Sequence, residues 1–99
     1  MIVRLTGEAE ADLEAIGDRI AEDDTKRAAT FVGELRERCL GLARFPKRFP
    51  LVPRYERHGI RHLVHGNYLI FYGVEDAAVV VVHVLRGAMD YSGILFPEE

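Results

Sequence analysis

The chain has 99 residues, of which 48% are hydrophobic and 29% are charged, and its formal net charge is −3. This length favours one domain spanning residues 1–99, and the balanced composition excludes wholesale disorder. No apolar run approaches the roughly 18 residues that span a bilayer, so no membrane association is expected. With one cysteine, Cys39, and no recognisable signal peptide, the sequence predicts a cytoplasmic protein without an internal disulfide.

The charge is unevenly distributed along the chain. Residues 1–30 carry a net charge of −4, residues 31–65 carry +5, and residues 66–99 carry −4. A basic middle in an acidic protein suggests a local anionic partner, either a nucleic acid or an acidic protein. The alternative, which stays open, is that Arg36 and Arg38 simply solvate a helix face and Arg44 completes its C-terminal end.

Two helices are predicted in the first half, after a short strand at residues 2–5. Thr6 is a good N-cap, and the apolar spacing behind it predicts a helix over about residues 7–22. Asp23 or Asp24 can cap a second amphipathic helix, which should stop near Phe45 because Pro46 follows. The two helices form an αα-hairpin, and residues 46–53 are a connection rich in bases and aromatics.

Three strands are predicted in the second half, at residues 60–65, 68–74 and 79–85, with turns at 66–67 and 75–76. The third strand is apolar on both faces and should be central, whereas the strand at 2–5 should be an edge. Residues 86–99 form a tail with one helical turn around 90–95. The predicted fold class is α+β, of order β-α-α-β-β-β, in which the αα-hairpin (7–45) packs on an antiparallel meander (54–86).

Most catalytic motifs are absent from the sequence, which has no P-loop, GxGxxG, HExxH or GxSxG pattern. Cys39 lies on an apolar helical stripe and is predicted to be a buried structural thiol. His62 and His65 fall on opposite faces of one strand, so neither a metal nor another cofactor is expected. His83 lies in a very apolar strand and is predicted to be a hydrogen-bonded core or edge histidine.

Several charged and aromatic side chains remain as candidates for contacts with a partner. They are Arg48, Arg54, Arg61, Arg86, Asp90 and Tyr91. Arginine can hold a phosphate or carboxylate by two parallel bonds, and tyrosine can anchor an interface. The structural alternative is an ion pair of Arg61 with an acid, or of Arg86 with Asp90, that ties the tail to the sheet.

Four segments together resemble the ParE toxins of the RelE/ParE superfamily. They are Leu5-Thr6 with Ala9–Ile16, then Ala28-Ala29 with Phe31 and Leu35, then Arg61 with Tyr68–Tyr72, and last Val82–Tyr91. The resemblance covers nearly the whole chain in order. It implies the toxin of a type II toxin–antitoxin module, concerned with plasmid or chromosome stability, that inhibits DNA gyrase by binding. It also implies a hetero-oligomer with a ParD-like antitoxin, and no sequence-specific DNA binding by the toxin alone.

Two alternatives remain within this superfamily. A RelE-like protein would cut messenger RNA on the ribosome, and the resemblance would then make Arg61, Arg86 and Tyr91 catalytic, with His62 or His83 as substitutes. The net charge of −3 and the lack of lysine beyond Lys47 argue against that reaction, which develops charge on a phosphate. The other alternative is a diverged, weakly toxic member, because Met89 stands where arginine is common in the family's closing motif.

Overall fold

A computed structural model describes residues 1–98, and the predicted order of strands and helices is confirmed. The elements are β1 (Ile2–Leu5), α1 (Gly7–Ala21), α2 (Thr25–Gly41), the 3₁₀-helix η1 (Glu56–His58), β2 (Arg61–His65), β3 (Tyr68–Glu75), β4 (Ala78–Arg86) and α3 (Ser92–Leu95). The four strands form one sheet in the order β1-β4-β3-β2. β1 runs parallel to β4 at one edge, and β2, β3 and β4 form the predicted antiparallel meander.

Both helices begin at the predicted caps. The Thr6 hydroxyl oxygen accepts a hydrogen bond from the Ala9 N–H at 3.1 Å, and the Asp24 carboxylate accepts one from the Arg27 N–H at 3.0 Å. The second helix ends somewhat before the predicted stop near Phe45, since α2 ends at Gly41. Residues 42–44 tighten into turns whose N–H groups bond three residues back. Among the described residues, no helix is both long enough and apolar enough to cross a membrane.

A β-bulge in β4 decides which side chains face the helices. Phe71 pairs with His83 but Tyr72 pairs with Val81, so Val82 has no partner on β3. As a result Val81 and Val84, three residues apart, both pack in the core on the helix side. The carbonyl of Val82 accepts a hydrogen bond from the Thr6 hydroxyl at 3.0 Å, which ties the bulge to the start of α1.

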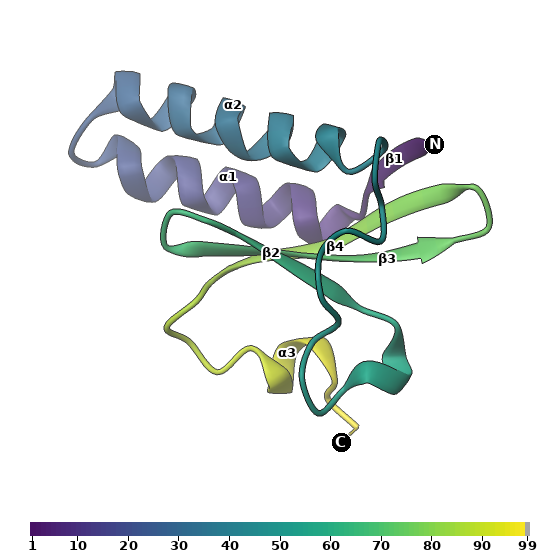
Figure 1. The fold of residues 1–99 in the computed structure, drawn as a ribbon. Helices are drawn as coiled ribbons and strands as arrows, with labels where there is room; N and C mark the ends of the chain where they lie inside the picture. Colours follow the sequence, from purple (N-terminus) through teal and green to yellow (C-terminus); the bar gives the residue numbers. More distant parts are fainter. Residues whose placement is uncertain (99) are drawn as a thin grey trace.

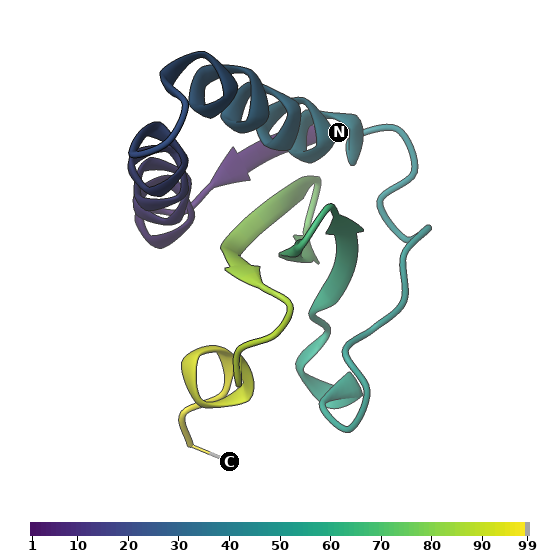
Figure 2. The same ribbon diagram turned by 90° about the vertical axis from the view of Figure 1, so that its left-hand side faces the viewer.

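The sheet is covered on both faces. The α1–α2 hairpin lies over one face, as predicted, and its apolar stripe packs on β3 and β4 (Figure 1). The opposite face has a smaller core of its own, consisting of Val52, Phe71, Leu85 and Phe96. Figure 2 shows that the C-terminal tail and the segment around η1 lie on this second face, away from the helices. The tail is therefore part of the packed fold.

Candidate functional site

Arg61 and Tyr72 together hold the connection that leads from α2 to the sheet. They face each other across the β2–β3 pair. The Arg61 Nη1 atom donates to the carbonyls of Phe49, at 2.7 Å, and Lys47, at 3.3 Å. The Tyr72 hydroxyl donates to the carbonyl of Pro46 at 2.7 Å. Tyr72 is fully buried, and this burial raises its pKa.

This arrangement gives Arg61 a structural role. Its guanidinium binds backbone carbonyls and no carboxylate among residues 1–98, so the structural alternative of an ion pair between Arg61 and an acid is not the one formed. Two donors on adjacent strands fix three carbonyls within four consecutive residues, 46–49. A loop that is otherwise exposed thereby acquires a defined backbone conformation.

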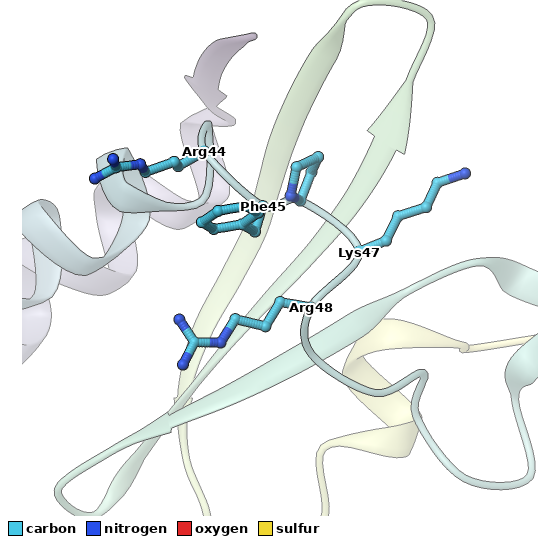
Figure 3. Close-up of a pocket in the computed structure, with 5 residues that line it drawn as sticks. Arg44, Phe45, Lys47 and Arg48 are labelled. Atoms are coloured by element: carbon cyan, nitrogen blue, oxygen red, sulfur yellow. The ribbon is translucent and has the colours of Figure 1, made fainter.

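The loop held in this way presents a basic groove. Arg44, Phe45, Pro46, Lys47 and Arg48 line an open groove of about 560 Å³. In Figure 3 the ring of Phe45 lies between the side chains of Arg44 and Arg48, whereas Lys47 extends the other way. The Arg48 guanidinium also lies 5.6 Å from the centroid of the Phe49 ring. Of the predicted contact residues, this groove contains Arg48.

A second group of predicted residues meets beside the tail. Arg54, Asp90 and Tyr91 line a pocket of about 390 Å³ together with Tyr55 and Met89. The Asp90 carboxylate accepts two hydrogen bonds from Ser92, one from its N–H at 3.2 Å and one from its hydroxyl at 2.7 Å. It therefore stabilises the turn that opens α3, and the alternative of an Arg86–Asp90 ion pair is not formed among the described residues.

Arg86 lies elsewhere, at the exposed end of β4. It lines a small pocket of about 180 Å³ with Asp12, Arg19 and Tyr68, between α1 and the sheet. The ring of Tyr91 packs against Phe71, with centroids 4.9 Å apart. The three side chains that a RelE-like nuclease would use thus lie in three places, since Arg61 is under the 46–49 loop. The structure does not gather them around one point.

Asp12 and His83 form a pair that sequence reasoning only half anticipated. The Asp12 Oδ2 atom lies 2.8 Å from His83 Nδ1 and accepts a second hydrogen bond from the Val84 N–H at 2.9 Å. His83 is thus the hydrogen-bonded histidine that was predicted, whereas the role of Asp12 was missed. The available signal was its place immediately before the buried Leu13, on a helix whose other acids lie on the solvent side.

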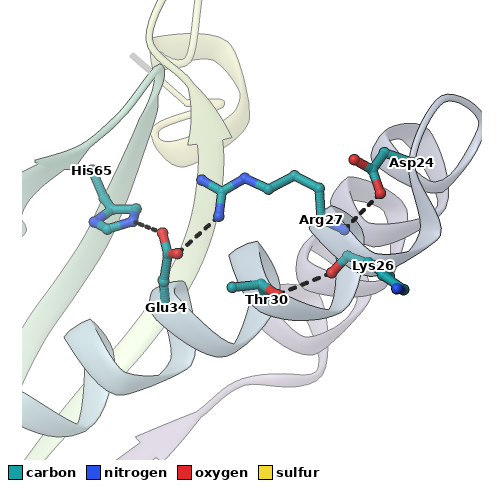
Figure 4. Close-up of polar contacts among 6 residues, drawn as sticks. All are labelled: Asp24, Lys26, Arg27, Thr30, Glu34 and His65. Atoms are coloured by element: carbon teal, nitrogen blue, oxygen red, sulfur yellow. Dashed lines mark hydrogen bonds and ion pairs between the residues drawn. The ribbon is translucent and has the colours of Figure 1, made fainter.

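A polar contact also joins α2 to the end of β2. Glu34 accepts a hydrogen bond from Arg27 Nη1 at 2.9 Å and lies 3.2 Å from His65 Nε2 (Figure 4). The Arg27 hydrogen bond, with a smaller effect from His65, lowers the pKa of Glu34. As predicted, His65 and His62 point to opposite faces, because their rings approach Phe31 and Phe71 respectively.

Neither a metal centre nor a reactive thiol is found in the described part of the chain. No group of three or more potential ligands among residues 1–98 could hold a metal ion. Cys39 is completely buried, and burial raises the pKa of its thiol to about 11. A thiol so rarely ionised at neutral pH is a packing residue, as its place on the apolar stripe predicted.

Comparison with known proteins identifies the family of this chain. Residues 3–91 match the family described as ParE toxin of type II toxin-antitoxin system, parDE. The chain belongs to the ParE toxin family. It is therefore a toxin of the type II class within the RelE/ParE superfamily, as the sequence resemblance implied. A search of the curated proteins found no match.

Two solved structures resemble this ParE family member. A chain of the chromosomal ParDE TA system from P. aeruginosa has a TM-score of 0.75 and 21% identity, covering 87% of this chain and 95% of that one. A chain of the toxin–antitoxin complex RelBE2 from Mycobacterium tuberculosis has a TM-score of 0.64 and 27% identity, covering 89% and 92%. The first likeness concerns the fold alone, which is the α+β fold predicted from the sequence.

The structure also places the residue at which this ParE toxin departs from the family's closing motif. Met89 is 41% exposed and lines both the Arg86 pocket and the Arg54 pocket. An apolar thioether therefore stands between the two exposed arginines, where the resemblance leads us to expect a further positive charge.

Proposed function

We propose that this toxin acts by binding DNA gyrase in the cytoplasm and that a ParD-like antitoxin neutralises it in a hetero-oligomer. The observation that carries the proposal is the match of residues 3–91 to the ParE family. Its physical support is the separation of Arg61, Arg86 and Tyr91. Phosphodiester cleavage requires cations and an acid or base within a few ångströms of one reacting phosphate, and Arg61 is already bonded to two carbonyls.

The antitoxin part of the proposal is supported by the surfaces that the fold leaves open. β1 and β2 are the two edges of the sheet, but residues 50–52 already pair with the start of β2, so β1 is the edge that offers unpaired backbone groups to a partner strand. A groove of about 570 Å³ runs between α1 and α2, with small residues such as Gly17 and Ala28 along it. It offers room for a partner helix or extended segment. The two similar solved structures come from a ParDE system and a RelBE2 toxin–antitoxin complex.

A second candidate function is ribosome-dependent cleavage of messenger RNA. The observation that favours it is the 27% identity with a chain of the RelBE2 complex. Its three catalytic side chains would have to converge on binding, because Arg61 is bonded to the 46–49 loop while Arg86 and Tyr91 line different pockets. The net charge of −3 opposes approach to the phosphate-rich ribosome.

Two assays on the purified toxin separate these functions. Gyrase should lose supercoiling activity in the presence of the toxin, while message on translating ribosomes should stay intact. In cells that express the toxin without antitoxin, a DNA-damage response should precede any arrest of translation. Site-specific cuts in ribosome-bound message that disappear in Tyr91→Phe would refute the gyrase proposal and establish the nuclease. No effect on gyrase, on ribosome-bound message or on cell growth would identify a weakly toxic member. In that case Met89→Arg is the variant whose toxicity should be measured.

The antitoxin is tested by co-expression of the toxin with the small protein encoded beside it. The two should co-purify, and the complex should leave gyrase active. A toxin that accumulates alone without slowing growth, and that has no co-purifying neighbour in low salt, would contradict this part of the proposal.

A further inference from the structure

The connection after α2 contains a short tandem repeat whose two copies have different environments. Residues 44–50 read Arg-Phe-Pro-Lys-Arg-Phe-Pro, so that Arg-Phe-Pro occurs twice. In the second copy Phe49 packs against the helix-side core, with the Arg48 guanidinium over its ring. In the first copy Phe45 is 60% exposed. A phenylalanine exposed to this extent between cations is the composition of a contact site rather than of an ordinary surface.

The cations beside Phe45 have no acidic partners within residues 1–98. Arg44, Lys47 and Arg48 are all exposed, and none of them forms an ion pair in the described chain. Elsewhere among residues 1–98, arginines do have carboxylate partners, as in the pairs Arg4–Glu75, Arg27–Glu34 and Arg36–Glu10. The charge of the 44–48 loop is therefore left uncompensated, although the chain as a whole is acidic.

The loop is also held in place before any partner arrives. The buried Tyr72 hydroxyl binds the Pro46 carbonyl at 2.7 Å, and Arg61 binds the carbonyls of Lys47 and Phe49. A surface whose backbone is already fixed loses less conformational entropy on binding than a free loop does. Tyr72 and Arg61 are therefore positioning residues for the groove, and they do not line it.

We propose that residues 44–48 form a preorganised docking site for an acidic peptide segment of a partner protein. One aliphatic or aromatic side chain of the segment packs on Phe45, and carboxylates on either side of it pair with Arg44 and Arg48. The positions in Figure 3, where the ring of Phe45 lies between the side chains of Arg44 and Arg48, match that pattern. The site lies apart from the Arg86 and Tyr91 pockets, and it does not depend on gyrase being the target.

A peptide fits this site better than a nucleic acid does. A polynucleotide is a long polyanion that extends beyond the loop and meets the acids on the exposed side of α1, such as Glu8 and Glu14. A short peptide experiences mainly the cations within a Debye length of about 8–10 Å. Charge complementarity at that range increases the association rate and orients the segment, while the apolar contact contributes to its retention.

The test uses the full chain and a defined probe. A fluorescein-labelled peptide of about twelve residues, with one central tryptophan between runs of aspartate and glutamate, is titrated with toxin and followed by anisotropy. Phe45→Ala should weaken binding about tenfold or more. Arg44→Gln and Arg48→Gln should each weaken it several-fold and reduce the loss of affinity between about 50 and 300 mM salt.

Two matched controls should bind like the wild type. Lys26→Gln removes one positive charge at the far end of α2, and Ile94→Ala truncates an exposed apolar side chain on α3. Because Phe45 is exposed, Phe45→Ala should keep the wild-type unfolding temperature, which separates lost binding from lost folding.

Three results would overturn the proposal as a whole, and a fourth would overturn its apolar contact. The first is no anisotropy change for the wild type, and the second is equal peptide binding by the wild type and Phe45→Ala. The third is tighter binding of a single-stranded oligothymidine of equal length, which would make the loop a nucleic-acid site. A probe with glycine in place of tryptophan that binds equally well would overturn the role of the apolar anchor. A failed gyrase assay leaves each of these readouts unchanged.

Discussion

Tyr72→Phe is the substitution that most directly tests how the basic loop is held. Tyr72 is fully buried, and its hydroxyl donates to the Pro46 carbonyl at 2.7 Å. Phenylalanine keeps the ring and its packing but removes the donor. The carbonyl of the half-buried Pro46 then loses this partner.

The expected cost follows from that single loss. A hydrogen bond between neutral groups contributes about 1 kcal/mol, and an unsatisfied buried acceptor costs about 1–3 kcal/mol. We expect Tyr72→Phe to lower the free energy of unfolding by about 1–2 kcal/mol. For a domain of this size that corresponds to a fall in melting temperature of roughly 4–16 °C.

Chemical and thermal unfolding monitored by circular dichroism measures this effect. Tyr68→Phe is the matched control, because Tyr68 lies on the same strand, is half-buried, and makes no hydrogen bond through its hydroxyl among the described residues. It should change stability by less than about 0.5 kcal/mol. Equal stability of Tyr72→Phe and the wild type would refute the stabilising role of the Tyr72–Pro46 hydrogen bond, and with it the preorganisation of the loop.

Three further predictions concern the core. Leu35→Ala should lower the free energy of unfolding in urea by about 2–5 kcal/mol, because Leu35 is fully buried; a near-neutral effect would contradict the packing of α2. Asp12→Ala should cost about 1–3 kcal/mol, since the Val84 N–H and His83 lose their acceptor, whereas Asp12→Asn retains an acceptor and should cost less. Burial raises the pKa of Cys39 from 9.0 to about 11, so its contribution to stability is present below pH 9.0 and is lost as pH rises through about 11. Urea unfolding of Cys39→Ala should therefore show a shallower fall in stability from pH 9 to 10 than the wild type, and parallel curves would refute this assignment.

The elements that the sequence predicted correctly have local causes. Thr6 and Asp24 begin helices because their side chains satisfy N–H groups three residues ahead. Gly66 has a φ of +60° in the β2–β3 turn, a conformation that glycine adopts without strain. The apolar stripe of α1 faces the core because a spacing of three or four residues returns side chains to one side of a helix. These causes sufficed for the α+β fold class and the order β-α-α-β-β-β.

The closing of the second face could not be predicted in this way. Phe96 and Val52 end short apolar runs in the tail and in a loop, and these runs are too short to show a periodicity that would indicate a buried face. Only the folded sheet brings them against Phe71 and Leu85. The bulge at Val82 could not be predicted from the sequence either, because it is defined only by the pairing of β4 with β3.

The roles of the candidate residues were decided by partners distant in the sequence. Arg61 and Tyr72 bind carbonyls 12–26 residues away, and His83 meets Asp12 across 71 residues. Residue type alone told us that an arginine within a strand needs an anion or an acceptor. Which acceptor it finds depends on how the chain returns to the sheet. The sequence by itself determined the family, the order of elements and the sites of its charges, whereas the tertiary structure decided which charges are used in holding the fold and which remain available to a partner.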